Sequence, residues 1–281
     1  MPKFREPSIG AYYDEPPAVA TDGHRSWVTR ARNFAIVYTE AKAGAKIAGD
    51  FADEHFLYMV DGHLRIAAGG EQAELEGESL AIVPPGASEI AVLADGVFVQ
   101  VVTDAEAIVA LAPNAAAYAD GAPEVTPTQA WPEPVGGYRL RAWALPEVYA
   151  SGGMVNAFRT RKLMVAPYPR FPEPRDETKL TPHSHEDFEQ ASVALEGEWV
   201  HHLRVPWTAN RQDWRADEDI EIGSPSTTII PAGVIHTSRG VTGEGWVLLD
   251  VFGPPRVDFS LRPGAVRNAE DYPMPAEPEP A

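Results

Sequence analysis

The sequence predicts an all-β fold of two tandem barrels, on three grounds. Short apolar runs, rich in β-branched and aromatic residues, alternate with turn signals that the 27 prolines and 23 glycines supply. Segments with helical periodicity are scarce, and TDAEAIVALA (103–112) is the best candidate. The order of the strand and turn signals also occurs twice along the chain, which indicates duplication of one barrel unit.

The repeated signals can be followed directly in the sequence. In the first half, FLYMVDG (56–62) ends in a turn, and SLAIVPPGASE (79–89) follows it. In the second half, ASVALEG (191–197) ends in a turn, and STTIIPAGVIH (226–236) follows. Each pair indicates two strands of a barrel joined by a reversal of the chain.

The domain organisation expected from these repeats has five parts. Four prolines and a glycine pair between the halves predict a linker, and a carboxyl end rich in proline and glutamate predicts a flexible tail. The segment 205–219 lengthens the second half and is expected to form a loop over the barrel mouth. The parts are an N-terminal arm (1–24), a first barrel (25–122), a linker (123–137), a second barrel (138–266) and the tail (267–281).

Composition excludes several classes of function. With 23 Lys plus Arg against 41 Asp plus Glu, the formal charge of −18 disfavours nucleic acid and anionic membranes as partners. The absence of cysteine excludes disulfides, thiolate nucleophiles, iron–sulfur clusters and Cys-based zinc sites. The amino terminus has no apolar run of the kind found in signal peptides. We therefore expect a cytoplasmic protein with a small-molecule substrate.

Four side chains form a candidate metal site: His183, His185, Gln190 and His236. Two histidines separated by one residue point to the same face of a strand, and Gln190 is expected to begin the next strand. A tight corner at Pro231-Ala232-Gly233 would bring His236 back to the same barrel. Imidazole nitrogens with one further ligand suit a divalent transition metal ion, which we expect to be Zn, Fe, Mn, Ni or Cu, with Zn or Fe favoured.

These motifs resemble those of the cupin superfamily. Its first motif is His-x-His, three or four residues, Glu or Gln, six residues and Gly, and residues 183–197 fit it. Its second motif contains Pro-x-Gly-x-x-His, which residues 231–236 fit. The resemblance implies a jelly-roll barrel of the RmlC-like type in each half, hence a bicupin, with the metal site in the second barrel.

The motif carries Gln190 where most cupins have Glu, and Glu189 next to it is the alternative ligand. Counting back six residues from Gly197 selects Gln190, and strand alternation then turns Glu189 to the opposite face. With three neutral imidazoles and a neutral amide, a divalent ion keeps its full charge and is a stronger Lewis acid.

The first half resembles a cupin that has lost its metal site. Glu89 stands where His236 stands in the second half, and His55 stands at the position of Gln190. Ala48 and Asp50 replace the histidine pair. We expect a scaffold or a dimerisation surface for a homodimer, and a second site made of Asp50, His55 and Glu89 is the alternative.

Three residues are candidates for acid–base catalysis or substrate binding. His202 and Arg204 share one face of the strand that carries the run HHLR, and His201 takes the other face. Arg161 belongs to a basic run with Arg159 and Lys162, which could bind a substrate carboxylate. We predict His202, Arg204 and Arg161 as the catalytic residues.

Three functions fit these features. The first is a metal-dependent isomerase, cyclase, lyase or hydrolase that acts on a small oxygen-rich substrate by Lewis-acid and acid–base catalysis. The second is a dioxygenase of the quercetinase or pirin type, which anaerobic turnover would exclude. The third is a binding module without turnover. Gln190 favours the first function, because the resemblance links dioxygenase sites with Glu.

Overall fold

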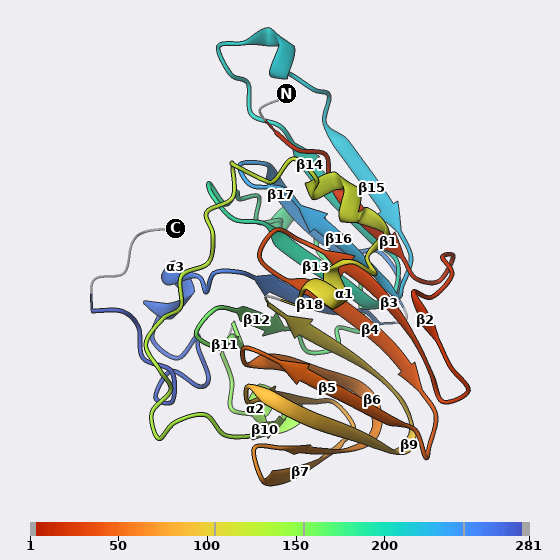
Figure 1. Cartoon of the computed structure of the whole chain (residues 1–281). Coiled ribbons are helices and arrows are strands. Elements are labelled where there is room, and N and C mark those ends of the chain that lie inside the picture. Colours follow the sequence, from red (N-terminus) through yellow and green to blue (C-terminus); the bar gives the residue numbers. More distant parts are fainter. Residues whose placement is uncertain (1–3, 104, 154, 244, 277–281) are drawn as a thin grey trace.

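The computed structural model describes residues 4–276 except 104, 154 and 244, and strands dominate it (Figure 1). The strands of the first half are β1 (Ser8–Ala11), β2 (Val19–Ala20), β3 (His24–Arg30), β4 (Ala35–Ala41), β5 (Lys46–Phe51), β6 (His55–Ala68), β7 (Glu71–Glu76), β8 (Ser79–Val83) and β9 (Gly86–Val102). The strands of the second half are β10 (Arg141–Ala144), β11 (Phe158–Arg159), β12 (Met164–Pro167), β13 (Gln190–Glu196), β14 (Trp199–Arg204), β15 (Glu218–Ile222), β16 (Ser226–Ile230), β17 (Ile235–Gly240) and β18 (Val247–Phe252). The predicted all-β fold class is confirmed.

The helices are short and lie between the strands. They are α1 (Glu106–Val109), α2 (Leu145–Ala150) and α3 (Val257–Ser260), with the 3-10 turns η1 (Pro113–Tyr118), η2 (Glu177–Lys179) and η3 (Arg211–Asp213). The helix predicted over 103–112 corresponds to the shorter α1, followed after Ala112 by η1. Among the described residues, no helix is both long and apolar enough to cross a bilayer.

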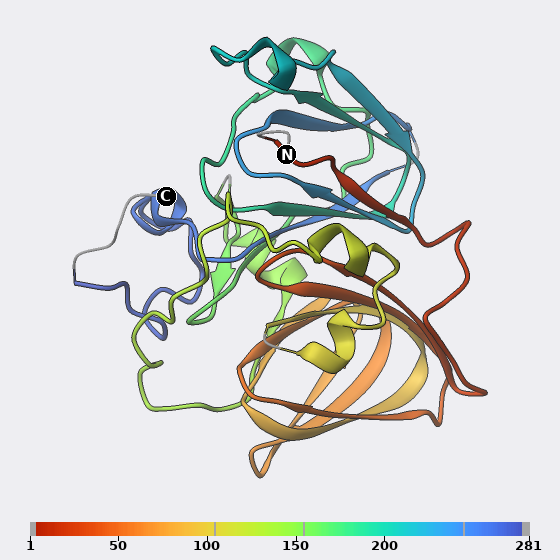
Figure 2. The ribbon, with the colours of Figure 1, turned by 45° about the horizontal axis from the view of Figure 1, so that its top comes forward.

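Three antiparallel sheets make up the two halves of the molecule. The first half forms a nine-stranded sheet in the order β10-β8-β6-β9-β4-β3-β2, with β5 paired to β9 and β7 paired to β6. The second half contains a six-stranded sheet, β1-β16-β13-β18-β12-β11, and a three-stranded sheet, β15-β14-β17. Figure 2 shows the two groups of strands one above the other, with the orange strands of the first half below and the red β1 in the upper group.

The two halves exchange edge strands. Strand β1, which lies in the expected N-terminal arm, pairs with β16 of the second half, with Ser8 opposite Ile229. Strand β10, which lies within the expected second barrel, pairs with β8 of the first half, with Arg141 opposite Ile82. Each exchange covers an edge that would otherwise present unpaired backbone groups.

Strand alternation divides the core into one layer between the halves and one interior in each half. The layer between the halves contains Tyr58 of β6, Val193 of β13 and Leu249 of β18. The next residue along each strand faces the interior of its own half. In the first half this interior is apolar, with Leu57 and Met59 of β6. In the second half it contains the polar side chains of Gln190, Ser192 and Asp250 beside apolar ones such as Trp199 and Leu248.

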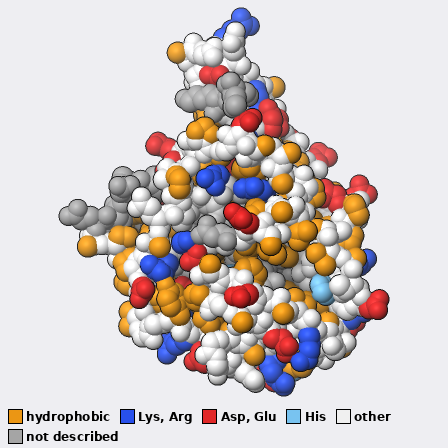
Figure 3. All heavy atoms as spheres, viewed as in Figure 1, with side chains coloured by type: hydrophobic (Ala, Val, Ile, Leu, Met, Phe, Trp, Pro, Cys, Tyr) orange, Lys and Arg blue, Asp and Glu red, His pale blue; other side chains and the backbone are white. Residues whose placement is uncertain are grey.

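Most charged side chains lie on the outside of this core, and Glu54, Glu189 and Asp250 are among the buried exceptions. On the face that Figure 3 shows, acidic and basic side chains are interspersed among apolar ones. Some of the exposed charges pair across neighbouring strands, as Arg65 of β6 does with Glu74 of β7 at 2.6 Å. Exposed pairs of this kind contribute less than about 1 kcal/mol each, so the buried layers determine the stability of the fold.

Two glycines shape the turns around the second interior. Gly197 follows β13 with φ +85°, and a Cβ there would lie 2.9 Å from the carbonyl oxygen of Gly245. Gly233 lies at the corner before β17 with φ +76°, and a Cβ there would lie 2.8 Å from the Phe4 ring. Both positions therefore require glycine.

The carboxyl-terminal segment packs against the body of the protein. Tyr272 is 1 % exposed in the core between the halves, and its hydroxyl donates a hydrogen bond to Glu54. The carbonyl oxygen of Tyr272 accepts a hydrogen bond from Arg159 Nε at 2.9 Å. The flexible tail expected over 267–281 is therefore contradicted for residues 267–276, and residues 277–281 lie outside the described part. The aromatic side chain supplies a hydrophobic anchor that the proline-rich composition hides.

We expect Tyr272→Ala to lower the free energy of unfolding by about 3–5 kcal/mol, because it removes a buried ring and its hydrogen bond. Urea denaturation checks this value. Leu261→Ala is the matched control, since Leu261 is 64 % exposed and its truncation should change stability by less than about 0.5 kcal/mol. If both variants unfold like the parent protein, the segment does not contribute to the core.

Candidate metal centre

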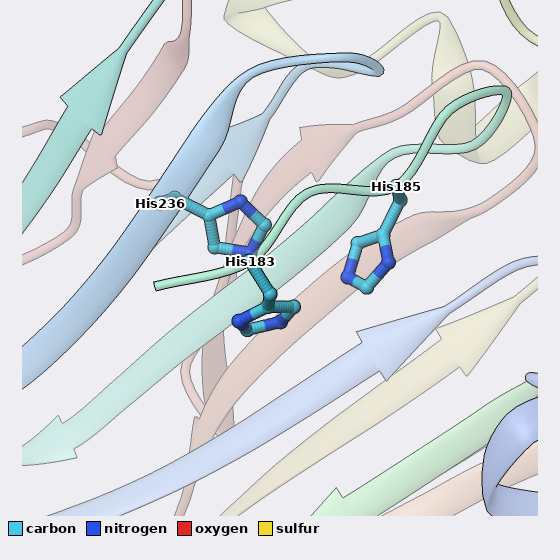
Figure 4. Close-up of side chains that lie close together, drawn as sticks. All are labelled: His183, His185 and His236. Carbon is cyan, nitrogen blue, oxygen red and sulfur yellow. The ribbon is translucent and has the colours of Figure 1, made fainter. Parts of the chain in front are cut away.

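Three histidines from two segments meet in the interior of the second half (Figure 4). His183 and His185 lie in the extended segment before β13, and His236 lies on β17. Backbone hydrogen bonds join His183 to His236 in both directions, at 3.0 and 2.7 Å. One ring nitrogen from each of the three histidines lies within 4.8 Å of the others, a spacing that fits ligation of one metal ion.

Gln190 completes the group from the first position of β13. Its Oε1 lies 3.1 Å from Nε2 of His185 and 3.1 Å from Nε2 of His236. Its amide nitrogen donates to Asp250 Oδ1 at 3.0 Å and to Ser192 Oγ at 3.1 Å. Ser192 in turn donates to the same Asp250 oxygen at 2.9 Å. The carboxamide is thereby fixed with its oxygen toward the histidines.

Backbone carbonyls select the tautomer of two of the rings. His183 Nδ1 lies 2.9 Å from the carbonyl oxygen of Thr181, and His236 Nδ1 lies 2.9 Å from that of Val234. A carbonyl oxygen can only accept, so Nδ1 carries the hydrogen in both rings. Nε2 of each ring then has its lone pair free for a metal, the usual arrangement when a second partner orients a histidine ligand.

Burial governs the protonation of the centre. It lowers the pKa of His236 to about 3, and burial together with the Arg256 guanidinium lowers the pKa of His185 to about 2. Arg256 lies over the Phe259 ring at 3.7 Å and pairs with Asp258 at 2.8 Å. Burial raises the pKa of Asp250, although Ser192 and the positive charge of Arg256 oppose this effect. His185 and His236 are therefore neutral at physiological pH and able to bind a cation.

Glu189, the alternative ligand, lies on the opposite face of the chain. Its side chain accepts hydrogen bonds from the Tyr118 hydroxyl at 2.8 Å and from the backbone nitrogen of Arg32 at 2.6 Å. Burial raises its pKa. Strand alternation separates Glu189 from the three histidines. The Glu189 carboxylate instead links the second half to the first through its hydrogen bonds with Tyr118 and Arg32.

His202 and Arg204 are not brought to the centre. His202 Nδ1 lies 2.6 Å from Asp219 Oδ1, and Arg204 pairs with Asp217 on the solvent side of β14. The register between β14 and β17 explains this, since His236 lies opposite Leu203 and Ser238 lies opposite His201. Directly opposite residues share a face, so the odd-numbered residues of β14 face inward.

His201 is therefore the inward histidine, where the sequence analysis selected His202. It is fully buried, and its Nδ1 lies 2.7 Å from Ser238 Oγ. Its Nε2 is buried without a hydrogen-bond partner among the described residues. Burial lowers its pKa to about 4.

The basic run of Arg159, Arg161 and Lys162, predicted to bind substrate, instead joins neighbouring segments of the chain. Arg161 Nε donates to the Trp131 carbonyl at 2.8 Å, and its guanidinium also bonds to the Tyr138 hydroxyl. Arg159 binds the carbonyl of Tyr272, and Lys162 pairs with Asp53 at 2.7 Å. These contacts hold the linker, the carboxyl-terminal segment and the first half. They do not place Arg161 at the centre.

The alternative site in the first half is not assembled. His55 is buried beside Phe51, with ring centroids 4.5 Å apart, while Glu89 is exposed and pairs with Lys46 at 3.0 Å. Burial lowers the pKa of His55 to about 4. In the part of the chain that the structure describes, the group of His183, His185 and His236 is the only one of three or more suitable side chains that fits a metal.

A cavity of about 480 Å³ opens beside the histidines. Its lining includes His183, Gln190, His236 and two residues that the sequence analysis missed, Asp250 and Arg175. Asp250 had a detectable signal, since it is a single carboxylate in the apolar run GWVLLDVF, and buried carboxylates are rare without a partner. Arg175 had none, because it lies in a polar loop.

The tryptophans near the long loop divide into two groups. Trp199 is buried and lines the cavity. Trp207 and Trp214 stack on each other with centroids 4.4 Å apart, and Trp207 is 76 % exposed. Neither of these two lines the cavity, and in Figure 1 the segment around η3 projects from the end of the molecule. The loop expected over the barrel mouth therefore extends away from it.

Comparison with known proteins identifies the fold. No family model and no curated sequence matches the chain. Among solved structures, AerE from Microcystis aeruginosa shares 8 % identity with a TM-score of 0.55, over 90 % of this chain and 99 % of AerE. A formate complex of Lactobacillus farciminis oxalate decarboxylase shares 13 % identity with a TM-score of 0.57, over 88 % and 86 %. Bacillus subtilis oxalate decarboxylase, described for its Mn(II) centres, shares 14 % with a TM-score of 0.55, over 91 % and 81 %.

At identities this low, the structural similarity shows a shared fold and does not identify the activity. Together with the three-histidine group and the strand architecture, they show that this chain has the all-β barrel fold of the cupin proteins.

Proposed function

We propose that the protein is a metal-dependent enzyme that acts on a small oxygen-rich substrate by Lewis-acid and acid–base catalysis. One observation carries the metal assignment: Gln190 Oε1 lies 3.1 Å from His236 Nε2. The amide oxygen is an acceptor, and Nε2 is also an acceptor, because Nδ1 holds the hydrogen of the neutral ring. Two acceptors facing each other in a buried site are unfavourable unless a cation lies between them.

Neither side of this contact can relieve the conflict by itself. A doubly protonated His236 would donate to Gln190, but burial holds its pKa at about 3. A rotated amide would turn its nitrogen toward His236, but it would lose the hydrogen bonds to Asp250 and Ser192. A divalent ion satisfies both groups at once, which supports His183, His185, Gln190 and His236 as its ligands.

The ligand set fits the chemistry proposed. Three neutral imidazoles and an amide oxygen leave the charge of a divalent ion uncompensated, and such an ion polarises a substrate carbonyl or hydroxyl. The set suits Zn or Fe first, and also Mn, Ni or Cu. Likeness to a manganese-containing oxalate decarboxylase supports a divalent ion in this fold.

Two groups that could move a proton line the cavity together with the histidines. Asp250 and Tyr168 both line the cavity, and the Tyr168 hydroxyl is hydrogen-bonded to Asp250. Burial raises the pKa of Asp250, which brings it closer to the range useful for a general base. Asp250 and Tyr168 would thus have the acid–base role that the sequence predicted for His202, Arg204 and Arg161.

We further propose that the first half is a cupin unit without a metal. Its interior face of β6 carries Leu57 and Met59, which fill the space with apolar side chains. It contributes to the core between the halves and pairs its β8 with β10. This half serves as a scaffold, with a homodimer through the barrels remaining a prediction.

We expect His183→Ala and His236→Ala to reduce zinc affinity by more than about 100-fold, since loss of a ligand's outer partner alone costs about 10–100-fold. Metal analysis of purified protein and calorimetric titration check this. His202→Ala is the matched control and should bind zinc like the parent protein, because its side chain faces Asp219 on the solvent side. Unchanged metal content in all three variants would contradict the assignment.

We expect Gln190→Glu to destabilise the metal-free protein by about 2–4 kcal/mol, because a second carboxylate would replace the amide that donates to Asp250. Adding Asp250→Asn should recover most of this loss, since the amide introduced by that second substitution can donate to the carboxylate introduced by the first. Thermal denaturation of the two single variants and the double variant, in the presence of a chelator, measures these changes in stability as a double-mutant cycle. Strictly additive effects of the two substitutions would show that the side chains do not interact.

A further inference from the structure

The cavity beside the histidines has an aromatic wall. Trp199 and Trp246 both line it, with ring centroids 5.1 Å apart and planes at 79°, so the two indoles form a corner. Leu248 adds a buried aliphatic side chain to this wall. At the mouth, Phe171 is 38 % exposed and stacks on Trp246 with centroids 4.4 Å apart. A ligand that enters the cavity therefore meets flat apolar surfaces on one side.

The cavity lining also includes three of the proposed metal ligands and one arginine. Arg175 Nη1 donates to the Ser238 carbonyl at 2.6 Å, and Nη2 donates to Thr181 Oγ1 at 2.9 Å. Thr181 also accepts from His183 through its carbonyl, and Ser238 follows His236 by two residues. Arg175 is thus attached directly to both segments that supply histidines.

The segment that contains Phe171 and Arg175 is fixed at both ends. Backbone hydrogen bonds join Phe171 and Trp246 at 3.3 and 3.0 Å, and the Arg175 nitrogen donates to the Gly240 carbonyl at 3.0 Å. The intervening sequence, Pro172-Glu173-Pro174, contains two prolines, which restrict the backbone. Phe171 and Arg175 are therefore held in place before a ligand arrives.

An anionic ligand in this cavity would pair with Arg175. Among the described residues that line the cavity, Arg175 is the only lysine or arginine, and the acidic ones are Glu173, Asp176 and Asp250. Glu173 is exposed, and Asp250 accepts hydrogen bonds from Gln190 and Ser192. The neighbouring Asp176 is exposed and is occupied by Thr178 and by Lys179 at 3.0 Å. A guanidinium has five N–H donors, and the two bonds that hold Arg175 leave donors for a carboxylate.

We propose that this cavity binds a planar, ring-bearing carboxylic acid with a second oxygen next to its carboxylate. The proposal rests on the proposed function, because the second oxygen would be the metal's substrate ligand. The carboxylate would pair with Arg175, and the ring would lie in the corner of Trp199 and Trp246. Rings prefer offset-stacked and edge-to-face contacts, which such a corner offers together.

The aromatic wall distinguishes this cavity from a site for a small diacid. Oxalate, the compound in the names of two structurally similar enzymes, has no apolar surface to place against two indoles and a leucine. A cavity of about 480 Å³ falls in the range of sites for larger organic ligands. The aromatic wall would be without a partner if oxalate were the ligand here.

Calorimetric titration of the zinc-loaded full chain tests the proposal with three probes: salicylate, 2-hydroxycyclohexanecarboxylate and oxalate. Salicylate should bind about three- to tenfold more tightly than its non-planar analogue. Phe171→Ala and Trp246→Leu should weaken salicylate binding by about the same factor and leave oxalate binding unchanged. Phe171 is partly exposed, so its variant is expected to fold even if the Trp246 variant does not. Arg175→Gln should weaken the binding of both salicylate and oxalate.

Trp207→Ala is the matched control, since it removes an exposed tryptophan outside the cavity and should change no affinity. The proposal is overturned if planar and non-planar acids bind alike, or if Phe171→Ala weakens oxalate as much as salicylate. Binding only at near-molar salicylate would also overturn it. Failure of the protein to take up zinc would instead refute the proposed function, so the two failures are distinguishable.

Discussion

The hydrogen bonds from the Gln190 amide to Asp250 and Ser192 are the interaction on which the centre depends. They make an otherwise rotatable carboxamide present its oxygen to His185 and His236. A carboxylate at this position would need no such orientation, but it would add a charge to the ligand set. The protein instead keeps the negative charge behind the ligand, on Asp250. This arrangement leaves a bound ion more electrophilic and still gives the amide an anionic hydrogen-bond partner.

The packing between the halves supports this geometry. The strands that carry Gln190 and Asp250 also send Val193 and Leu249 into the core between the halves. Each strand thus has one apolar face against the first half, and its other face carries a polar side chain toward the centre. The exchange of β1 and β10 further ties each half to the other's sheet. The first half therefore contributes to the position of the proposed ligands in the second half.

Spacing in the sequence predicted the part of the site that depends on local geometry. The intervals among His183, His185 and Gln190, and the corner before His236, are short enough for strand alternation and turn chemistry to determine them. The separation of Gln190 from Glu189 followed from the same alternation. The alternative second site at Asp50, His55 and Glu89 did not form, because β5 and β9 turn Glu89 toward solvent while His55 faces inward.

Features set by pairing between distant strands could not be predicted in the same way. The choice between His201 and His202 depends on the register of β14 against β17, and a shift of one residue would reverse it. Arg175 and Asp250 reach the cavity from segments far apart in the sequence, and Tyr272 packs from a segment whose composition indicated disorder. Edge-strand exchange likewise leaves no local signal. Long-range pairing was thus the main source of error.

The most direct measurement for the central claim is a crystal structure of the zinc-loaded protein with anomalous scattering data collected at the zinc edge. The account predicts one zinc ion in the second half, bound by imidazole nitrogens of His183, His185 and His236 and by Oε1 of Gln190. The Gln190 amide nitrogen should remain bonded to Asp250. Zinc bound elsewhere, or an occupied centre from which Gln190 has turned away, would contradict it.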